Sequence, residues 1–203
     1  YGEQKIQPIS ESASITPSNP YGYSKFLAEE IIKYYCKHKG FNGVVFRYFN
    51  ACGCDFDGKV QATHESHLLA KLMSVIVGKE EQLIINGSDY NTYDGTCVRD
   101  FVHVLDIAAA HLLALGQMGK FSGFNLFNIG TGKGVSVLEM VNAAAEALNK
   151  MIPMQLGQRR EGDVAEAVAD NSKIKGELGF SAQFSDLETI VKTAFRQTQN
   201  NQS

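Results

Sequence analysis

A helix that leads directly into a buried strand constrains the fold of this chain more than any other feature of its sequence. Asn19 can cap a helix and Pro20 suits its first position, which predicts a helix from Pro20 to about His38 that ends at Gly40. Residues 44–48 are β-branched or aromatic apart from one arginine, as in a strand of a parallel sheet. A helix followed by such a strand is half of a βαβ unit, so we expect an α/β fold with a parallel sheet.

The predicted first helix also carries an apolar stripe. Leu27, Ile31, Tyr34 and Tyr35 recur at the spacing of one helical face. Because a helix of an α/β fold packs one apolar face against its sheet, we expect this stripe to be buried.

Helices and strands alternate along the rest of the chain. The predicted strands are residues 83–85, 97–104, 125–129 and 154–156. The predicted helices are residues 66–77, 106–118, 136–150 and 172–178, with a last helix that begins at Ser185. The predicted N-caps are Asp106, Ser136, Ser172 and Ser185, and a glutamate three residues after Ser136 and Ser185 completes a capping box with each.

Tyr21 and Lys25 lie one helical turn apart on the predicted first helix, so their side chains share a face. An ammonium group beside a phenol favours the phenolate and lowers the tyrosine pKa by roughly 1–3 units from its usual value near 10. Such a phenol can act as a general base near neutral pH. A Tyr-x-x-x-Lys pair also occurs by chance on helix surfaces, so this pair gains weight only from the motifs that accompany it.

The composition favours a globular protein without nucleic-acid or membrane partners. The chain has 203 residues, is 44% hydrophobic and carries a net charge of −3, which gives no electrostatic attraction for nucleic acid or an anionic membrane. No apolar run is long enough to span a bilayer. Cys52 and Cys54 are too close for an ordinary disulfide or a C-x-x-C pair, so we expect reduced thiols in a cytoplasmic protein.

Two motifs suggest a binding site but do not match the known patterns. The segment from Gly130 to Gly134 lies between a predicted strand and a helix, yet it fits neither common phosphate-binding glycine pattern, and a tight turn explains it. His64-Glu65-Ser66-His67 lacks the H-E-x-x-H spacing of zinc enzymes, so we expect no metal site.

Three arginines, Arg99, Arg159 and Arg160, are candidates for binding an anionic ligand, because the planar guanidinium suits phosphate oxygens. Acids stand near them in the sequence, so surface ion pairs remain the alternative. Arg47 ends a predicted strand and is more simply explained by a structural ion pair, and we assign structural roles to His103 and His111.

Five blocks of the sequence together resemble the extended short-chain dehydrogenase/reductase family. Each block is a weak signal alone, but they follow the order and approximate spacing of the family and cover nearly the whole chain. The blocks are Asn19–Lys25, Arg47–Asn50, Val98–Asp106, Asn128–Gly130 and Arg159–Asp163.

The resemblance implies a fold in two parts. Residues 1–50 would form the last part of a Rossmann-like, doubly wound parallel sheet that binds NAD, and residues 51–203 a smaller α/β lobe that binds a nucleotide sugar. Residues 97–130 alternatively return to the NAD domain. The opening Tyr1-Gly2-Glu3 resembles the end of a family segment that carries a catalytic Ser or Thr. We therefore expect the chain to be the C-terminal portion of a larger enzyme, and to be inactive alone.

The resemblance also implies the activity. The parent enzyme would interconvert UDP-glucose and UDP-galactose, with UDP-N-acetylglucosamine and UDP-N-acetylgalactosamine as a further pair, by transient oxidation at C4 of the sugar with bound NAD. Tyr21 would exchange the proton of the 4-hydroxyl group, Lys25 would lower the Tyr21 pKa and hold the nicotinamide ribose, and Phe49 would contact the nicotinamide. A cytoplasmic homodimer is the implied assembly.

Several residues match positions of the family that bind the UDP-hexose substrate. Arg99 and Arg160 match residues that hold the pyrophosphate, Asp163 matches one that holds the ribose, and Asn50 matches one that contacts the sugar. His67 stands where the family has an asparagine that reaches the diphosphate.

The base and the sugar are assigned in the same way. The backbone of Ile84, Ile85 and Asn86 would read uracil. Ala167 would line the sugar pocket, where small side chains admit 2-acetamido sugars and bulky ones restrict the enzyme to plain hexoses. The alternative for Ala167 is that neighbouring side chains fill the space it leaves.

Two other functions remain open. One is a different NAD-dependent nucleotide-sugar enzyme, such as an epimerase of UDP-glucuronate or a 4,6-dehydratase, although the sequence identifies no acid pair for a dehydratase. The other is a non-catalytic module that binds a UDP-sugar or has a structural role alone.

Overall fold

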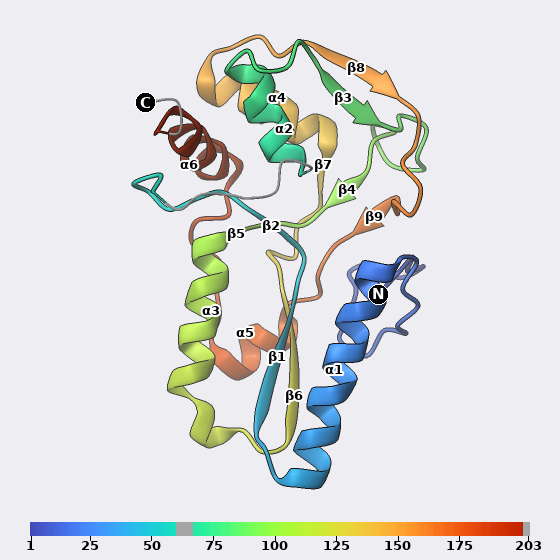
Figure 1. The fold of residues 1–203 in the computed structure, drawn as a ribbon, viewed down its shortest axis with the longest axis vertical. Coiled ribbons are helices and arrows are strands. Elements are labelled where there is room, and N and C mark those ends of the chain that lie inside the picture. Colours follow the sequence, from blue (N-terminus) through green and yellow to red (C-terminus); the bar gives the residue numbers. More distant parts are fainter. Residues whose placement is uncertain (60–66, 201–203) are drawn as a thin grey trace.

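The computed structural model describes residues 1–59 and 67–200 (Figure 1). The molecule is elongated, and its helices and longer strands form two groups that short strands connect. The helices are α1 (Pro20–Lys39), α2 (Leu68–Ile76), α3 (Val104–Gly116), α4 (Val137–Leu148), α5 (Ser172–Leu178) and α6 (Leu187–Asn200), with a 3-10 turn at Met118–Lys120. The strands are β1 (Gly43–Tyr48), β2 (Asn50–Cys52), β3 (Leu83–Asn86), β4 (Val98–Arg99), β5 (Phe101–His103), β6 (Phe124–Ile129), β7 (Val135–Ser136), β8 (Met154–Gly157) and β9 (Glu166–Ala167).

The first group is built on the parallel strands β1 and β6. Their register runs from Gly43 opposite Phe124 to Tyr48 opposite Ile129. In Figure 1, α1 lies on one side of this pair, and α3 and α5 lie on the other. The expected α/β fold with parallel strands is therefore confirmed. The core of this group consists of Val102, Ala110, Ala114, Phe127, Ile129, Ile174, Leu178 and Phe180.

The second group packs α2, α4 and α6 beside the parallel pair of β3 and β8. The register of this pair runs from Leu83 opposite Met154 to Asn86 opposite Gly157. Its core is separate from that of the first group. The largest fully buried side chains of this core are Leu72, Leu83, Ile85, Met140 and Ile190.

A buried aspartate lies where the chain crosses between the two groups. The Asp100 carboxylate accepts hydrogen bonds from the main-chain N–H groups of Thr131, Gly132 and Ala169 at 2.7, 2.9 and 3.2 Å. It interrupts the strand predicted over residues 97–104, which is instead β4, paired with β7 and β9, and β5, paired with β2. Because N–H groups of the glycine-rich segment bond to this carboxylate, that segment is the tight turn that the sequence predicts.

The start of α3 differs from the prediction. His103, not Asp106, is the N-cap, and its Nδ1 accepts a hydrogen bond from the Leu105 N–H at 3.1 Å. The Asp106 carboxylate instead accepts hydrogen bonds from residues 183–185, at 2.8, 3.0 and 2.6 Å. A distant segment therefore competes successfully for the side chain that sequence reasoning assigned to the local cap.

The other helix starts show one success and two errors. The capping box of Ser136 and Glu139 is present at the start of α4, as predicted. The residue before α5 is Asn171, so Ser172 is the first helical residue and not its cap. At α6 the side chain of Asp186, not that of Ser185, accepts a hydrogen bond, from the N–H of Thr189 at 2.8 Å.

The apolar stripe of α1 is exposed, and the prediction that it is buried is wrong. Leu27, Ile31, Tyr34 and Tyr35 all have exposed side chains, and the buried residues of the helix are Glu29 and Cys36. No described element covers the stripe within residues 1–59 and 67–200. Sequence periodicity identified an apolar face correctly but could not show which face meets the sheet.

An ion pair attaches α1 to β1. Arg47 donates hydrogen bonds from Nε and Nη2 to the two carboxylate oxygens of Glu29, at 2.9 and 2.6 Å. The Arg47 guanidinium also lies 4.5 Å from the centre of the Tyr1 ring. Both side chains of the pair are mostly buried, so the two-pronged contact offsets much of the cost of removing two charges from water. This is the structural ion pair that the sequence predicts for Arg47.

The four cysteines, Cys36, Cys52, Cys54 and Cys97, are buried, and none of them forms a disulfide. Among the helices that the structure describes, we find none that is both long and apolar enough to cross a membrane.

Removal of the Arg47 side chain tests the contribution of this ion pair to stability. We expect Arg47→Ala to lower the free energy of unfolding by about 2–4 kcal/mol, because it leaves the Glu29 carboxylate mostly buried without its partner. Lys33→Ala is the matched control, since Lys33 forms an exposed pair with Glu30 on the same helix and should cost less than about 0.5 kcal/mol. Urea unfolding measures both, and equal losses would contradict the interpretation.

The pH dependence of stability should report His103. Burial lowers the pKa of this histidine below its usual 6.5, against an opposing effect of Asp106 and Asp186. The unfolded chain therefore takes up the proton first, so stability is complete above about pH 7 and decreases as the pH falls through 6.5 toward the folded-state pKa. His103→Asn keeps a capping oxygen but cannot take up the proton. Between pH 7 and 5 its unfolding free energy should change less than that of the parent; identical slopes would exclude His103 as the cause.

Candidate functional site

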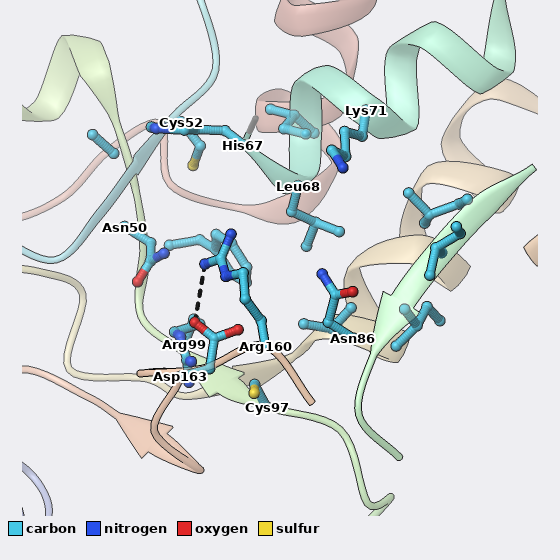
Figure 2. Close-up of a pocket in the computed structure, with 17 residues that line it drawn as sticks. Asn50, Cys52, His67, Leu68, Lys71, Asn86, Cys97, Arg99, Arg160 and Asp163 are labelled. Atoms are coloured by element: carbon cyan, nitrogen blue, oxygen red, sulfur yellow. Dashed lines mark hydrogen bonds and ion pairs between the residues drawn. The ribbon is translucent and has the colours of Figure 1, made fainter. Parts of the chain in front are cut away.

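A pocket of about 340 Å³ opens between the start of α2, the strand β3 and the short strands β2 and β4 (Figure 2). It therefore lies beside the crossing between the two groups. The residues that line it are Asn50, Ala51, Cys52, His67, Leu68, Leu69, Lys71, Leu83, Ile84, Ile85, Asn86, Cys97, Arg99, Phe101, Val137, Arg160 and Asp163.

The pocket brings together residues that the sequence assigned to substrate binding from distant parts of the chain. Eight of the nine predicted residues line it, namely Asn50, His67, Ile84, Ile85, Asn86, Arg99, Arg160 and Asp163. The ninth, Ala167, is partly buried on β9, directly opposite Arg99 on β4.

The arginines of the pocket differ in their partners. Arg160 donates a hydrogen bond from Nη2 to Asp163 Oδ1 at 3.0 Å. Arg99 donates from Nη1 to the main-chain oxygens of Val98 and Ala165, at 2.9 and 3.5 Å, which fixes its side chain without neutralising its charge. Two guanidinium groups and one carboxylate thus give this part of the pocket a positive charge, which suits an anionic ligand.

Arg159, the third arginine candidate, does not line the pocket. It forms an exposed ion pair with Asp89, with 2.7 Å between Nε and Oδ1, and covers the Tyr90 ring at 4.3 Å. The surface ion pair that the sequence left as the alternative is therefore the arrangement found.

The start of α2 adds to the positive potential of the pocket. His67 is the N-cap, and the first N–H in the helical hydrogen-bond pattern is that of Lys71, which donates to the His67 oxygen at 3.0 Å. The N–H groups before it, including those of Leu68 and Leu69 at the pocket wall, have no partner within the helix. A helix start of this kind favours negative charge.

Tyr21 and Lys25 lie outside this pocket, on the first turns of α1. Asn19 caps the helix as predicted, since its Oδ1 accepts a hydrogen bond from the Gly22 N–H at 2.8 Å. Lys25 Nζ is 5.3 Å from the centre of the Tyr21 ring, so the two side chains do share a face. Tyr21 is 72% exposed, which leaves its hydroxyl open to a ligand.

The turn that carries Arg160 and Asp163 passes close to the start of α1. A Cβ atom placed on Gly162 would lie 3.9 Å from the Ser18 hydroxyl oxygen, two residues before the helix. The polar residues of the pocket and the Tyr21–Lys25 pair thus lie on neighbouring segments, although the chain does not place them in one cavity. Phe49, the third predicted cofactor residue, follows β1 and has its ring 6.3 Å from that of Tyr1.

The sequence analysis missed several lining residues. Lys71 could have been found from its spacing, because it lies one turn after His67 on a predicted helix. Cys52 and Cys97 gave no such signal, since a buried thiol is also an ordinary core residue. Burial raises the pKa of Cys52, so this thiol stays protonated and is no nucleophile at neutral pH.

Among the described residues we find no cluster of three or more His, Cys, Asp or Glu side chains that could hold a metal ion. His64 and Glu65 of the motif considered above lie outside the described residues.

Comparisons with known proteins show the family. Residues 1–130 match the NAD dependent epimerase/dehydratase family. UDP-glucose 4-epimerase of Halalkalibacterium halodurans is 39% identical over 197 residues, which are 96% of this chain and 59% of that protein.

Solved structures agree in fold. UDP-glucose 4-epimerase from Bifidobacterium longum, in complex with NAD+ and UDP, has a TM-score of 0.91 at 32% identity and covers 100% of this chain and 61% of its own. The UDP-Glc/GlcNAc 4-epimerase from the human pathogen Campylobacter jejuni has a TM-score of 0.79 at 35% identity and covers 98% of this chain and 61% of its own. The chain spans about three fifths of the length of these relatives. With nearly two thirds of its residues in the family match and a shared fold throughout, the chain belongs to the NAD dependent epimerase/dehydratase family.

Proposed function

We propose that the whole protein to which this chain belongs interconverts UDP-glucose and UDP-galactose by transient oxidation at C4 of the sugar. The observation that carries the proposal is the pocket. It gathers eight residues, which the family resemblance assigns to substrate binding, around one positively charged cavity. The family of the chain and the UDP-glucose 4-epimerases among its relatives support the same reaction.

UDP-hexose binding follows from the chemistry of the pocket wall. Arg99, Arg160 and the start of α2 suit the diphosphate, because each presents N–H donors with positive charge. Asp163 can accept hydrogen bonds from ribose hydroxyl groups. The strand β3 offers the main chain of Ile84 to Asn86 to the base.

The residues near the start of α1 suit the nicotinamide ribose end of NAD. Lys25 supplies an ammonium donor for ribose hydroxyl groups, and the main chain of Phe49, directly after β1, contacts the nicotinamide in this proposal. When bound, NAD supplies the acceptor and then the donor of the hydride of C4. Tyr21 takes up the proton of the sugar 4-hydroxyl group. It returns this proton after the 4-keto sugar has rotated to present its other face, so protons and electrons balance over the cycle.

The proposal extends to domains, location and assembly. We assign the first group to the NAD domain and the second group to the UDP-sugar lobe. Residues 97–130 contribute to both, since Phe101 packs in the core of the second group and Val102 in that of the first. Four thiols that form no disulfide support a cytoplasmic protein. The exposed apolar stripe of α1 supports a homodimer, which sedimentation of the whole protein would test.

Tyr21→Phe tests the catalytic role of the phenol in the whole protein. We expect turnover of UDP-galactose to fall by roughly 10²–10⁴-fold, the usual effect of losing a general acid/base, with UDP affinity nearly unchanged. Tyr23→Phe is the matched control, because Tyr23 is also exposed on the same helix and should keep full turnover. A coupled assay of UDP-glucose formation measures both, and near-normal turnover of Tyr21→Phe would exclude the assigned role.

In this proposal, Ala167 determines which UDP-sugars the enzyme accepts. Its side chain is small, and Ala167 pairs with the pocket residue Arg99 on the neighbouring strand, so in this proposal an acetamido group at C2 of the sugar fits beside it. We therefore propose that UDP-N-acetylgalactosamine is also a substrate. The Campylobacter jejuni relative, a UDP-Glc/GlcNAc 4-epimerase, supports this extension.

A larger side chain at position 167 should separate the two substrates. We expect Ala167→Tyr to lower turnover of UDP-N-acetylgalactosamine by at least about 100-fold, because the ring fills the space of the acetamido group, and to change that of UDP-galactose only a few-fold. Ala167→Ser, which stays small, should retain both activities. Parallel assays on both substrates decide the matter: loss of neither activity in Ala167→Tyr would mean that other side chains shape this part of the pocket.

A further inference from the structure

Lys71 is a cationic residue of the pocket that matches none of the family positions for substrate or cofactor binding. It follows His67 by four residues and Leu68 by three, so all three side chains lie on the face of α2 that borders the pocket. Figure 2 shows the Lys71 side chain directed from α2 toward the side of the pocket where Leu68 and Asn86 are drawn.

No acid of the described residues neutralises this ammonium group. None of the ion pairs within residues 1–59 and 67–200 includes Lys71. Asp163 is the one carboxylate among the described residues that line the pocket, and Arg160 binds it with 3.0 Å between Nη2 and Oδ1. Lys71 therefore adds an uncompensated positive charge to the pocket wall, which favours an anionic ligand.

The charge balance of the pocket identifies the class of anion. Among the residues that the structure describes, its side chains include three permanent cations, Lys71, Arg99 and Arg160, and the carboxylate of Asp163, which together carry a net charge of +2. Each phosphate of a nucleotide-sugar diphosphate carries about one negative charge. The two charges of such a diphosphate are balanced only if Lys71 is counted, since without it the lining would carry a single net positive charge.

We propose that Lys71 is a third cation of the diphosphate site and determines affinity for the diphosphate and not for the base. The ammonium group has three donors on a flexible stem and can reach phosphate oxygens from several directions. It stands one turn along from the start of α2, whose N–H groups favour the same anion. This inference rests on the proposed function in one respect, which is that the ligand is a uridine diphosphate.

Titration calorimetry on the whole protein tests the inference with UDP, UMP and uridine as probes. Lys71→Met removes the charge but keeps an unbranched chain of similar bulk. We expect it to weaken UDP binding by about tenfold or more, the usual effect of losing a charge-assisted contact. Uridine affinity should stay within about twofold, and the dependence of UDP affinity on salt should become shallower. Lys71→Arg, which keeps the charge, should retain most of the affinity.

Two controls make the outcome specific. Lys79 follows α2, is exposed and does not line the pocket, so Lys79→Met should leave UDP affinity unchanged. Because Lys71 is itself exposed, Lys71→Met should unfold at the same temperature as the parent, and circular dichroism verifies this.

The contrary results separate this inference from the proposed function. If the parent binds UDP and Lys71→Met binds it equally well, the role of Lys71 is refuted while the proposed function stands. Equal weakening of UDP and uridine also refutes it, because the lysine then contacts the base. A folded parent that binds neither UDP nor UMP overturns both.

Discussion

The buried carboxylate of Asp100 is the interaction on which the arrangement of the pocket depends. A carboxylate without exposed surface persists only when hydrogen bonds satisfy its oxygens, and three main-chain N–H groups and the Thr131 hydroxyl do so here. These donors come from segments 31 to 69 residues away in the sequence. The neighbours of Asp100 on either side, Arg99 and Phe101, both line the pocket. One polar centre therefore holds the pocket wall in register with the turn after β6 and with the segment that follows β9.

Sequence reasoning succeeded where a local interaction decides the structure. Helix α1 starts at Pro20 because Asn19 caps it, and α4 starts where Ser136 and Glu139 form their capping box. The strands β1, β3 and β6 coincide with short runs that contain β-branched or aromatic residues, β8 coincides with the run from Met154 to Leu156, and the predicted bounds of each lie within about two residues of those found. Short strands such as β2, β7 and β9 were missed, because two or three residues carry no periodicity and pair only through tertiary contacts.

The errors arise where distant residues compete for a side chain. Asp106 was assigned to a helix cap, but the main chain near Phe184 binds its carboxylate. Glu29 is buried against Arg47, while the apolar stripe on another face of α1 is exposed, so hydrophobicity alone misjudged which side meets the sheet. In the pocket, eight of the nine substrate-binding residues that were predicted from motif matches do line the cavity. Lys71 escaped because no motif includes it, although its spacing of four residues from His67 on a predicted helix indicates the same face.

Among the described residues, β1 pairs with another strand along one of its edges only, and this affects the solubility of the protein. In the part of the chain that the structure describes, β6 is the only strand that pairs with β1. The backbone groups along the opposite edge are directed away from β6, and a bare edge of this kind is a template on which another strand can add. Arg47 is the single charged residue of β1, so the strand has little built-in protection against such pairing. The solubility of the isolated chain should therefore depend on whether the edge of β1 opposite β6 is covered. In a concentrated solution, two copies would associate by pairing their β1 strands along this edge.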